Sequence, residues 1–284
     1  MTDTTAQRVD RSTDLATARM LEIWNRDGRH RLVRPTWFAQ WRALSSRLVR
    51  VNIKNGAIGA AFASAVIYTL GFYLPLKFVM GTKGIDYAQF VMPVIVLQTM
   101  AFTMMSAGLY AADDATKGLT SRLQTMPIPP LVPLGARMTS GFVRSIVSLV
   151  SALCLGYIIG FRLQGGLGQS VLFCVFALSF ATITSLGADA LGSLVRNPQA
   201  VSQMLTLPTV ILGMLSTGFM PESGFPSWIR PFVRNQPISQ FSLSMQQMAG
   251  DGVSFHTLFP SLLWLTGFLV VFAPLAIWAS GRRE

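Results

Sequence analysis

Charged side chains are scarce in this sequence: Asp, Glu, Lys and Arg make up 12% of its residues, whereas hydrophobic residues make up 51%. An average globular domain carries about 25% charged residues. Six stretches of 17 to 30 residues contain no charged residue at all. A soluble chain of this length would not gather its apolar residues in this way, so the composition argues against a soluble protein. The stretches are 55–76, 87–112, 145–161, 163–188, 197–221 and 252–281.

Cysteine and histidine are rare as well, with two residues of each. Cys154 and Cys174 lie in the middle of apolar stretches, where a small packing residue is expected rather than a disulfide partner. The sequence shows no metal-ligand spacing, no paired carboxylates and no G-x-S-x-G motif, so it offers no recognisable catalytic or metal centre. It also lacks a G-x-x-x-x-G-K-[ST] loop, which means that ATP hydrolysis, if any, must take place on another chain.

The charge-free stretches are continuous rather than alternating, which favours membrane-spanning helices over barrel strands. A bilayer core about 30 Å thick needs roughly 20 apolar residues of helix to cross it. The sequence therefore predicts an all-α membrane protein with six transmembrane helices, of which the third is close to the minimum length. Their approximate ranges are 56–76, 88–111, 145–161, 170–191, 202–220 and 259–278.

The net charge of +11 is explained by topology rather than by nucleic-acid binding. With a cytoplasmic N-terminus, 18 Lys and Arg residues lie on the inner side of the membrane and 5 on the outer side. This bias predicts a multi-pass protein of the plasma membrane with both termini in the cytoplasm. Anionic lipid headgroups are then the expected acidic partner. No cleavage site precedes the first stretch, so its span is expected to act as an uncleaved anchor.

Three segments follow from this pattern: a polar cytoplasmic segment at 1–35, an interfacial helix at 36–54, and a six-span domain at 55–284. In the interfacial helix, aromatic and aliphatic residues recur on one face and cationic residues lie off it, as expected for a helix in the headgroup plane. A partner-binding or solvated helix is the alternative. The apolar face consists of Trp37, Trp41, Leu44, Leu48 and Val51, with Trp37 and Trp41 as the membrane anchors.

The predicted inner segment between the second and third spans has an unusual pattern. It begins with Asp113 and Asp114, which are favourable at a helix N-terminus. Four prolines between 127 and 133 forbid further helix and predict a stiff turn back to the membrane. A short amphipathic helix of this kind suits docking into a groove of a partner, whereas an ordinary linker is the alternative. Its later polar residues are Lys117 and Arg122, and its apolar stripe is Leu119, Leu123 and Met126.

Asp189 is the one ionisable residue inside a predicted span. Ionisable residues at such positions are rare and often functional. Arg196 follows seven residues later on the same helical face, so an interfacial Asp paired with Arg or water is the simpler interpretation.

Several motifs resemble those of membrane subunits of type-two ABC exporters, and in particular the actinobacterial daunorubicin/doxorubicin-resistance permeases. The resemblance covers roughly residues 37–283, and the last motif is the most specific because it is long and punctuated by proline. The motifs are G-F-Y-x-P at 71–75, D-x₃-G-x₃-R-x₃-M-P at 114–127, G-Y-x-x-G-F-R at 156–162, A-D-x-x-G at 188–192 with R-N-P at 196–198, and F-P-x-W-I-x-P-F-V-R-N-Q-P-I-S at 225–239.

The resemblance implies a six-helix permease that pairs with a second permease subunit, of the same or a related chain, and with nucleotide-binding ATPase subunits. The chain itself would need no cofactor, since ATP and Mg²⁺ would bind to the partner. Residues 113–126 would form the coupling helix that transmits ATP-driven motion to the spans. Residues 221–250 would form re-entrant helices that cap the outer mouth between the fifth and sixth spans. The aromatic residues of this cap are Phe225, Trp228, Phe232 and Phe241.

A substrate path is then expected between spans 1, 2 and 5 of facing subunits, where methionine suits loosely specified apolar ligands. Ordinary helix packing is the alternative for each residue. The expected function is ATP-driven export of hydrophobic or amphipathic compounds, such as drugs, polyketides or cell-envelope lipids. An intramembrane lipid-modifying enzyme is the alternative function. The path residues are Phe72, Tyr73, Met100, Met104, Met105, Met204, Met214 and Phe219.

Overall fold

The computed structural model describes residues 36–75, 87–118, 129, 131–250 and 252–281, and the regular elements within these ranges are all helical. The chain divides into two compact units, Met1–Ala39 and Gln40–Glu284. Of the first unit the structure describes only residues 36–39, which include the start of helix α2 (Trp37–Lys54). There the rings of Trp37 and Phe38 meet edge to face. All other elements belong to the second unit.

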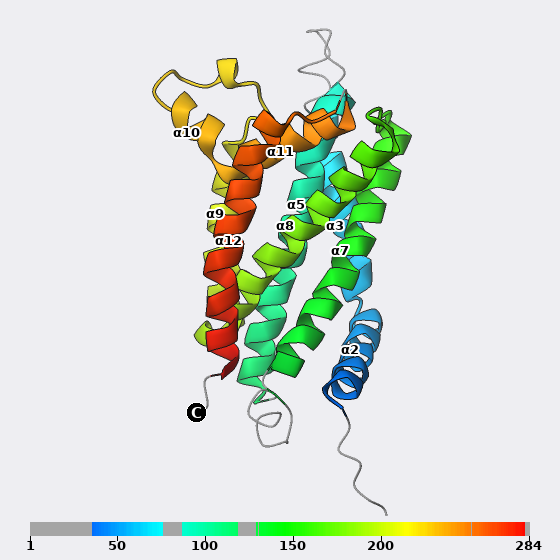
Figure 1. The fold of residues 1–284 in the computed structure, drawn as a ribbon, viewed down its shortest axis with the longest axis vertical. Helices are drawn as coiled ribbons and strands as arrows, with labels where there is room; N and C mark the ends of the chain where they lie inside the picture. The colour runs from blue at the N-terminus through cyan, green and yellow to red at the C-terminus, as the bar shows by residue number, and fades with distance from the viewer. Residues whose placement is uncertain (1–35, 76–86, 119–128, 130, 251, 282–284) are drawn as a thin grey trace, which may run out of the picture. The chain divides into compact units, whose positions relative to one another are not determined.

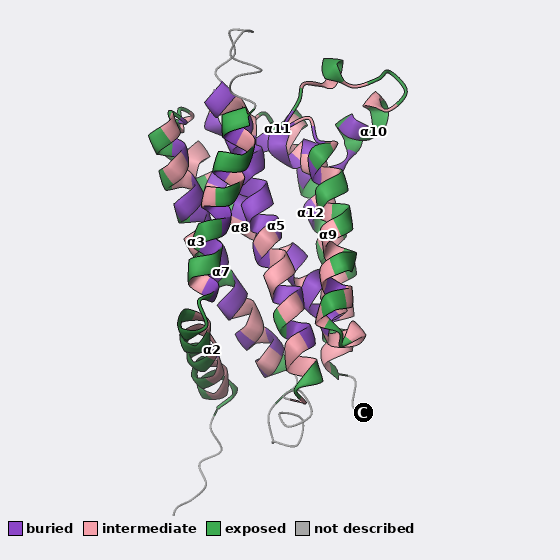
Figure 2. Ribbon diagram, turned by 180° about the vertical axis from the view of Figure 1, so that it is seen from behind, coloured by how far each residue is buried: buried purple, intermediate pink, exposed green. Residues whose placement is uncertain are grey.

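Helices α5 (Tyr87–Thr116) and α8 (Gly166–Val195) form the centre of the second unit and pack extensively against each other. Small residues allow their backbones to approach closely, as is typical of membrane helix pairs. A Cβ atom added at Gly192 would lie 2.2 Å from the carbonyl oxygen of Gly108. Much of α5 is buried, as Figure 2 shows, because other helices cover it on several sides.

Two groups of helices flank this central pair (Figure 1). Helices α7 (Leu131–Ile159) and α3 (Ala57–Tyr68) pack on each other and on α5, and α3 continues into a π-helical turn, η1 (Thr69–Tyr73). On the other side, α9 (Pro198–Met214) packs on α5, and α12 (Phe255–Gly281) packs on α8. The chain bends by 59° between α2 and α3, where Gly56 has a left-handed φ of 74° that glycine adopts without strain.

The sharp turn between α8 and α9 follows from three consecutive residues. Arg196 adopts a left-handed conformation and ends α8. The side chain of Asn197 then accepts hydrogen bonds from the backbone N–H groups of Gln199 and Ala200, at 3.0 and 3.2 Å, and so caps α9. Pro198 occupies the first helical position, where a missing N–H costs nothing.

Short helices follow α9, as expected from the prolines of this segment. They are η3 (Glu222–Gly224), α10 (Arg230–Asn235) and α11 (Pro237–Ala249). Helix α11 packs against α5, α8 and α12, and Figure 1 shows it lying across their ends. It is therefore part of the helical core rather than an open loop.

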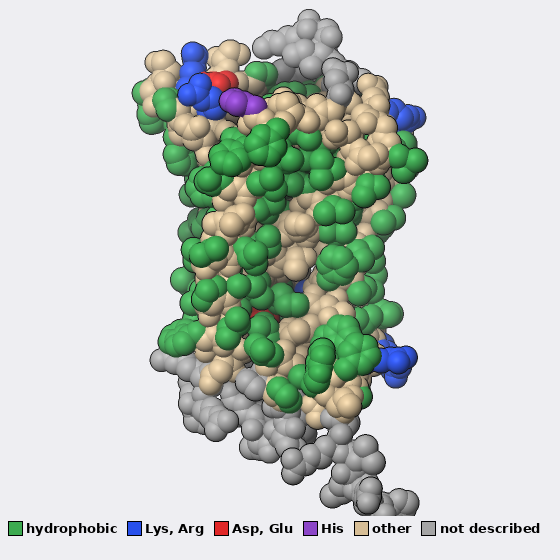
Figure 3. All heavy atoms as spheres, viewed as in Figure 1, with side chains coloured by type: hydrophobic (Ala, Val, Ile, Leu, Met, Phe, Trp, Pro, Cys, Tyr) green, Lys and Arg blue, Asp and Glu red, His purple; other side chains and the backbone are tan. Residues whose placement is uncertain are grey.

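The all-α membrane fold is confirmed, but the described residues support fewer spans than the six predicted. Four helices are long and apolar enough to cross a membrane, namely α5, α7, α8 and α12. The bent pair of α2 and α3–η1 is a fifth candidate, and α9 has only 17 residues. On the face drawn in Figure 3, hydrophobic side chains cover the middle, and Lys and Arg stand out mostly near the two ends. This is the surface expected of a membrane-spanning bundle.

The third predicted span lies almost entirely within a longer helix that begins well before it. We expected it at 145–161, whereas α7 runs from Leu131 to Ile159 and contains Pro133, Arg137 and Arg144. Pro133 does not prevent the helix because it lies in the first turn, where its missing N–H has no intrahelical partner. The two arginines are accepted because both contact neighbouring helices: Arg137 pairs with Asp189 of α8, and Arg144 lies over the ring of Tyr110 of α5.

Candidate functional site

The first residues of the predicted coupling helix lie at the end of a span helix. Asp113 and Asp114 belong to the last turn of α5, so their expected place at a helix N-terminus is wrong. The helix simply continues from the apolar stretch into these acids. Gly118, with a left-handed φ of 66°, follows its last turn. The other predicted coupling residues, Leu119, Arg122, Leu123 and Met126, lie outside the described residues.

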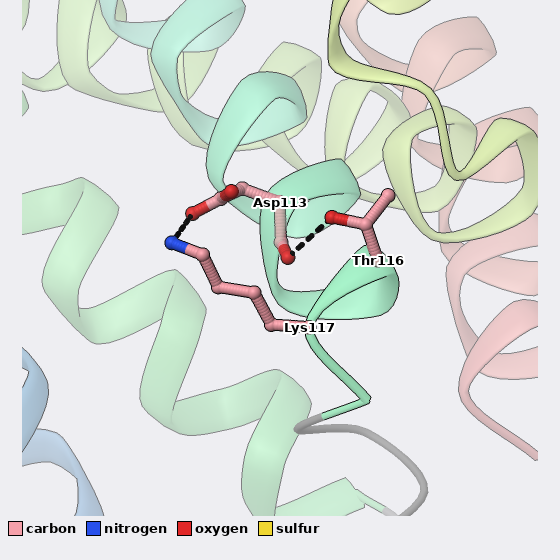
Figure 4. A network of polar contacts seen from close by, with 3 residues as sticks. All are labelled: Asp113, Thr116 and Lys117. Carbon is pink, nitrogen blue, oxygen red and sulfur yellow. Dashed lines mark hydrogen bonds and ion pairs between the residues drawn. The ribbon is translucent and has the colours of Figure 1, made fainter.

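An exposed ion pair closes this last turn. Figure 4 shows Lys117 reaching back to Asp113, with 2.6 Å between Nζ and Oδ2. The hydroxyl of Thr116 donates to the backbone oxygen of Asp113 at 2.8 Å. The hydrogen bond to Asp113 and the charge of that carboxylate raise the pKa of Lys117, so the amine is charged at neutral pH. Because the side chains of Lys117 and Asp113 are 61% and 43% exposed, water screens the pair and it contributes little to stability.

A second ion pair lies deeper and joins two helices. Arg137 of α7 donates two hydrogen bonds to Asp189 of α8, from Nε to Oδ1 at 2.7 Å and from Nη2 to Oδ2 at 2.9 Å. The side chain of Asp189 is 3% exposed and that of Arg137 is 15% exposed. Asp189 is thus paired with an arginine, as expected, but with Arg137 rather than with Arg196. Bidentate geometry of this kind makes the pair strong and fixes its orientation.

Arg144 lies two turns further along α7 and is even more buried. It is 4% exposed, and its guanidinium lies over the ring of Tyr110 of α5, 5.0 Å from the ring centroid. Its Nε has no hydrogen-bond partner among the residues that the structure describes. Such a cation–π contact offsets part of the desolvation of the charge, but it cannot replace a hydrogen bond in the plane of the guanidinium.

These groups share one cavity of about 280 Å³ between α2, α5, α7 and α8. The helix α2 contributes Arg47 and an apolar wall, and its Asn52 donates a hydrogen bond to Ser140 of α7. The cavity is therefore lined by charged side chains on one part of its surface and by aliphatic side chains of α2 on another. Its charged lining residues are Arg47, Asp113, Asp114, Lys117, Arg137, Arg144 and Asp189, and its aliphatic wall includes Leu44, Leu48 and Val51.

The predicted substrate-path residues do not form a single surface within the chain. Phe72 and Phe219 are in contact, with ring centroids 4.4 Å apart, and Tyr73 stacks near Tyr87. Met100 is fully buried in the core, which fits the packing alternative. Met104 and Met105 are half-buried on α5. By contrast, Met204 and Met214 are exposed on α9, so only a surface shared with lipid or another chain could use them.

The four aromatic residues expected in the outer cap also separate into two groups. Phe241 of α11 is fully buried and contacts the rings of Phe176 and Phe180, with centroids 5.7 and 5.1 Å away. Phe225 is half-buried, whereas Trp228 and Phe232 are exposed. Phe241 is therefore a core residue, and the other three lie around the short helices η3 and α10.

The two predicted membrane anchors, Trp37 and Trp41, differ in how far they are buried. Trp37 is exposed at the start of α2. Trp41 is half-buried and packs against α7, since a Cβ atom added at Gly135 would lie 3.3 Å from its ring. Both cysteines, Cys154 and Cys174, are free.

Sequence reasoning missed Arg137 and Arg144 as site residues because it counted them as part of an inner loop. A signal was present. Both arginines belong to one face of α7, whose members recur every three or four residues and include several buried hydroxyl side chains. That face includes Arg137, Ser140, Arg144, Ser148, Ser151 and Ala152.

Comparison with known proteins finds similarity to ABC transporter proteins in each case. A family model described as "ABC-2 family transporter protein" matches residues 52–278. Doxorubicin resistance ABC transporter permease protein DrrB of Mycobacterium tuberculosis (strain H37Rv) is 38% identical over 248 residues, which cover 82% of this chain and 86% of that protein. Probable doxorubicin resistance ABC transporter permease protein DrrC of the same strain is 27% identical over 222 residues, 75% of this chain and 79% of that protein. Daunorubicin resistance ABC transporter permease protein DrrB1 of Streptomyces coeruleorubidus is 26% identical over 220 residues, 75% of this chain and 76% of that protein.

Proposed function

The chain belongs to the ABC-2 family of transporter proteins, and we propose that it is the permease subunit of an exporter that moves drugs or similar amphipathic compounds out across the plasma membrane. The observation that carries this proposal is the match itself, which runs from the end of α2 into α12 and so covers all the helices between them. Relatives over most of its length are named as doxorubicin and daunorubicin resistance permeases. Polyketides and cell-envelope lipids are amphipathic compounds of the same general kind.

Energy for export would come from a separate nucleotide-binding subunit that holds ATP and Mg²⁺, since this sequence has no ATP-binding loop. Residues 113–126 are the proposed contact. Asp113, Asp114 and Lys117 lie at one end of α5, the central helix of the bundle, so a force applied there would act directly on α5 and its neighbours. A second permease subunit would cover the exposed apolar side of α9 and complete the path between facing subunits.

The alternative, an intramembrane lipid-modifying enzyme, would need an acid/base pair free to exchange protons. Asp189 is the acid that such an enzyme would use, and both of its oxygens are held by Arg137. A carboxylate held in this way is suited to a structural role. This geometry and the family membership both favour transport.

The test is co-expression with the ATPase subunit encoded in the native host. We expect the wild-type chain to retain that ATPase through purification and to lower the cellular accumulation of doxorubicin. Reversing the charges in the proposed contact, with Asp114→Lys and Arg122→Glu, should abolish both the retention of the ATPase and the exclusion of doxorubicin. Loss of a buried charged partner at an interface typically costs about 2–5 kcal/mol. Arg234→Glu, on the exposed end of α10, is the control and should leave both readouts unchanged.

Retention of the ATPase and full drug exclusion by the double variant would contradict the contact. Failure of the wild-type chain to retain any ATPase would contradict the transporter assignment as a whole.

A further inference from the structure

We propose that the cavity between α2, α5, α7 and α8 binds the phosphate of an anionic phospholipid from the inner leaflet, with Arg144 and Arg47 as its ligands. This goes beyond transport, because a lipid bound here would be held in the resting protein without any ATP.

The charges of the cavity leave a positive excess once its internal pairs are formed. Lys117 is neutralised by Asp113, and Arg137 by Asp189. Arg47 and Arg144 then remain, and neither is in an ion pair within the described part of the chain. Asp114 is the remaining acid, so a ligand with a single negative charge suits the cavity better than a polyphosphate would.

Arg144 shows most directly that a ligand is needed. A guanidinium that is 4% exposed and whose Nε lacks a partner among the described residues is costly, because desolvation of a charge is repaid only by a counter-charge with good geometry. The ring of Tyr110 contacts the guanidinium, 5.0 Å from the ring centroid to its central carbon, but it gives the Nε–H no acceptor. A phosphate oxygen is a natural partner for that N–H, since arginine binds phosphate through paired N–H groups.

The size and walls of the cavity favour the headgroup of a lipid. Sites for drug-sized ligands occupy roughly 300–1,000 Å³, and this cavity of about 280 Å³ lies at the lower limit. The wall formed by Leu44, Leu48 and Val51 of α2 offers an apolar surface beside the arginines. An amphiphile could therefore place its phosphate on Arg144 and Arg47 while its glycerol and upper acyl chains contact α2.

The position of the cavity in the membrane also suits an anionic phospholipid as its ligand. The cavity lies at the end of the bundle that contains the last turn of α5, which the distribution of Lys and Arg places on the cytoplasmic side. That leaflet is the one that carries anionic lipids.

The experiment uses the full-length chain in a non-ionic detergent, without nucleotide, so that its outcome does not depend on transport. Binding of the short-chain lipid dioctanoyl phosphatidylglycerol is measured by thermophoresis, and dioctanoylglycerol serves as the same tails without phosphate. We expect saturable binding of the phospholipid and at least about tenfold weaker binding of dioctanoylglycerol, the difference that a charge-assisted hydrogen bond typically makes.

Arg144→Gln and Arg47→Gln should each weaken phosphatidylglycerol binding by about tenfold. Arg47 is exposed, so its variant tests the site even if the buried substitution at Arg144 impairs folding. Arg162→Gln is a matched control, because Arg162 also lies over a tyrosine ring, Tyr157, at 5.1 Å but is exposed and does not line the cavity. It should bind like the wild type.

Equal affinity of the wild type and both cavity variants would overturn the site. Equal binding of dioctanoylglycerol would overturn the role of the phosphate. Displacement of the phospholipid by an equal concentration of inorganic phosphate would overturn the lipid as its source.

Discussion

At the scale of single residues, the same kind of contact has two different roles in this protein. The Lys117–Asp113 pair lies in the last turn of α5 with both side chains exposed, whereas the Arg137–Asp189 pair is buried between α7 and α8. Exposed pairs contribute little because water and salt screen them. A buried pair seldom adds net stability either, but it is expensive to break, because removal of one partner strands a charge. Arg137 and Asp189 therefore hold α7 and α8 in one relative position.

We predict that Asp189→Asn destabilises the protein by about 3–5 kcal/mol, because it leaves the Arg137 guanidinium buried without its counter-charge. The double variant Arg137→Met with Asp189→Leu should recover most of that loss, since no charge is then stranded. Thermal unfolding in detergent, followed by tryptophan fluorescence, measures both effects. Lys117→Gln is the control and should have no measurable effect. If the double variant is no more stable than Asp189→Asn, the stranded charge of Arg137 is not the cause of the loss.

At the scale of elements, the central contact between α5 and α8 depends on residues without side chains. The backbones meet where Gly192 faces Gly108, only one turn from Asp189. Small residues at such a position let helices gain van der Waals contact in a lipid environment, where hydrophobic association is weak. Helix α8 also packs on α7, where Asp189 accepts its two hydrogen bonds from Arg137.

We predict that Gly192→Ala destabilises the bundle by about 1–3 kcal/mol, because the new Cβ atom would lie 2.2 Å from the Gly108 carbonyl oxygen and the helices must separate. The direction of this change in stability is informative, because alanine by itself stabilises a helix relative to glycine by about 1 kcal/mol. Gly59→Ala in α3 is the control, as its Cβ atom would meet nothing within 4 Å, and it should be neutral or slightly stabilising. Equal melting temperatures for the two variants would contradict the close contact.

At the scale of the whole molecule, the bundle leaves wide apolar surfaces uncovered. Leu207 of α9 is 64% exposed and Val270 of α12 is 65% exposed. Such surfaces would aggregate in water, whereas in a membrane they can face lipid tails. The polar groups lie instead inside the bundle or at its ends, which is the arrangement that an orientation in the bilayer requires.

We predict that the end of the bundle with α10 faces the outside of the cell, because 18 of the 23 Lys and Arg residues then lie in the cytoplasm. In a background with Cys154→Ser and Cys174→Ser, a cysteine at Ser227 should react with a membrane-impermeant maleimide in intact cells. A cysteine at Thr116, at the opposite end of the bundle, should react only after permeabilisation (Figure 1). Both positions are exposed, so a reversed result would reverse the orientation.

The sequence alone was sufficient to identify the all-α membrane class and the family, but not the bounds of every helix. Continuous charge-free stretches predict spans because the bilayer requires them, and this holds whatever the helices contact. The R-N-P triplet at 196–198, which was noted only as part of the family resemblance, forms the end of α8 and the cap of α9 in the structure. These features depend on local chemistry or on the membrane, so they can be recognised without knowledge of packing.

Only the tertiary structure decided which polar residues belong together. Counting charges places Arg137 and Arg144 in a loop, because an isolated charge is unfavourable in lipid. In the fold they lie within α7, since Asp189 and Tyr110 on neighbouring helices receive them. The same is true of Phe241, which was expected in the outer cap and is buried against α8. Whether a side chain inside a helix is tolerated depends on what the next helix presents to it, and that is a property of packing between distant segments of the chain.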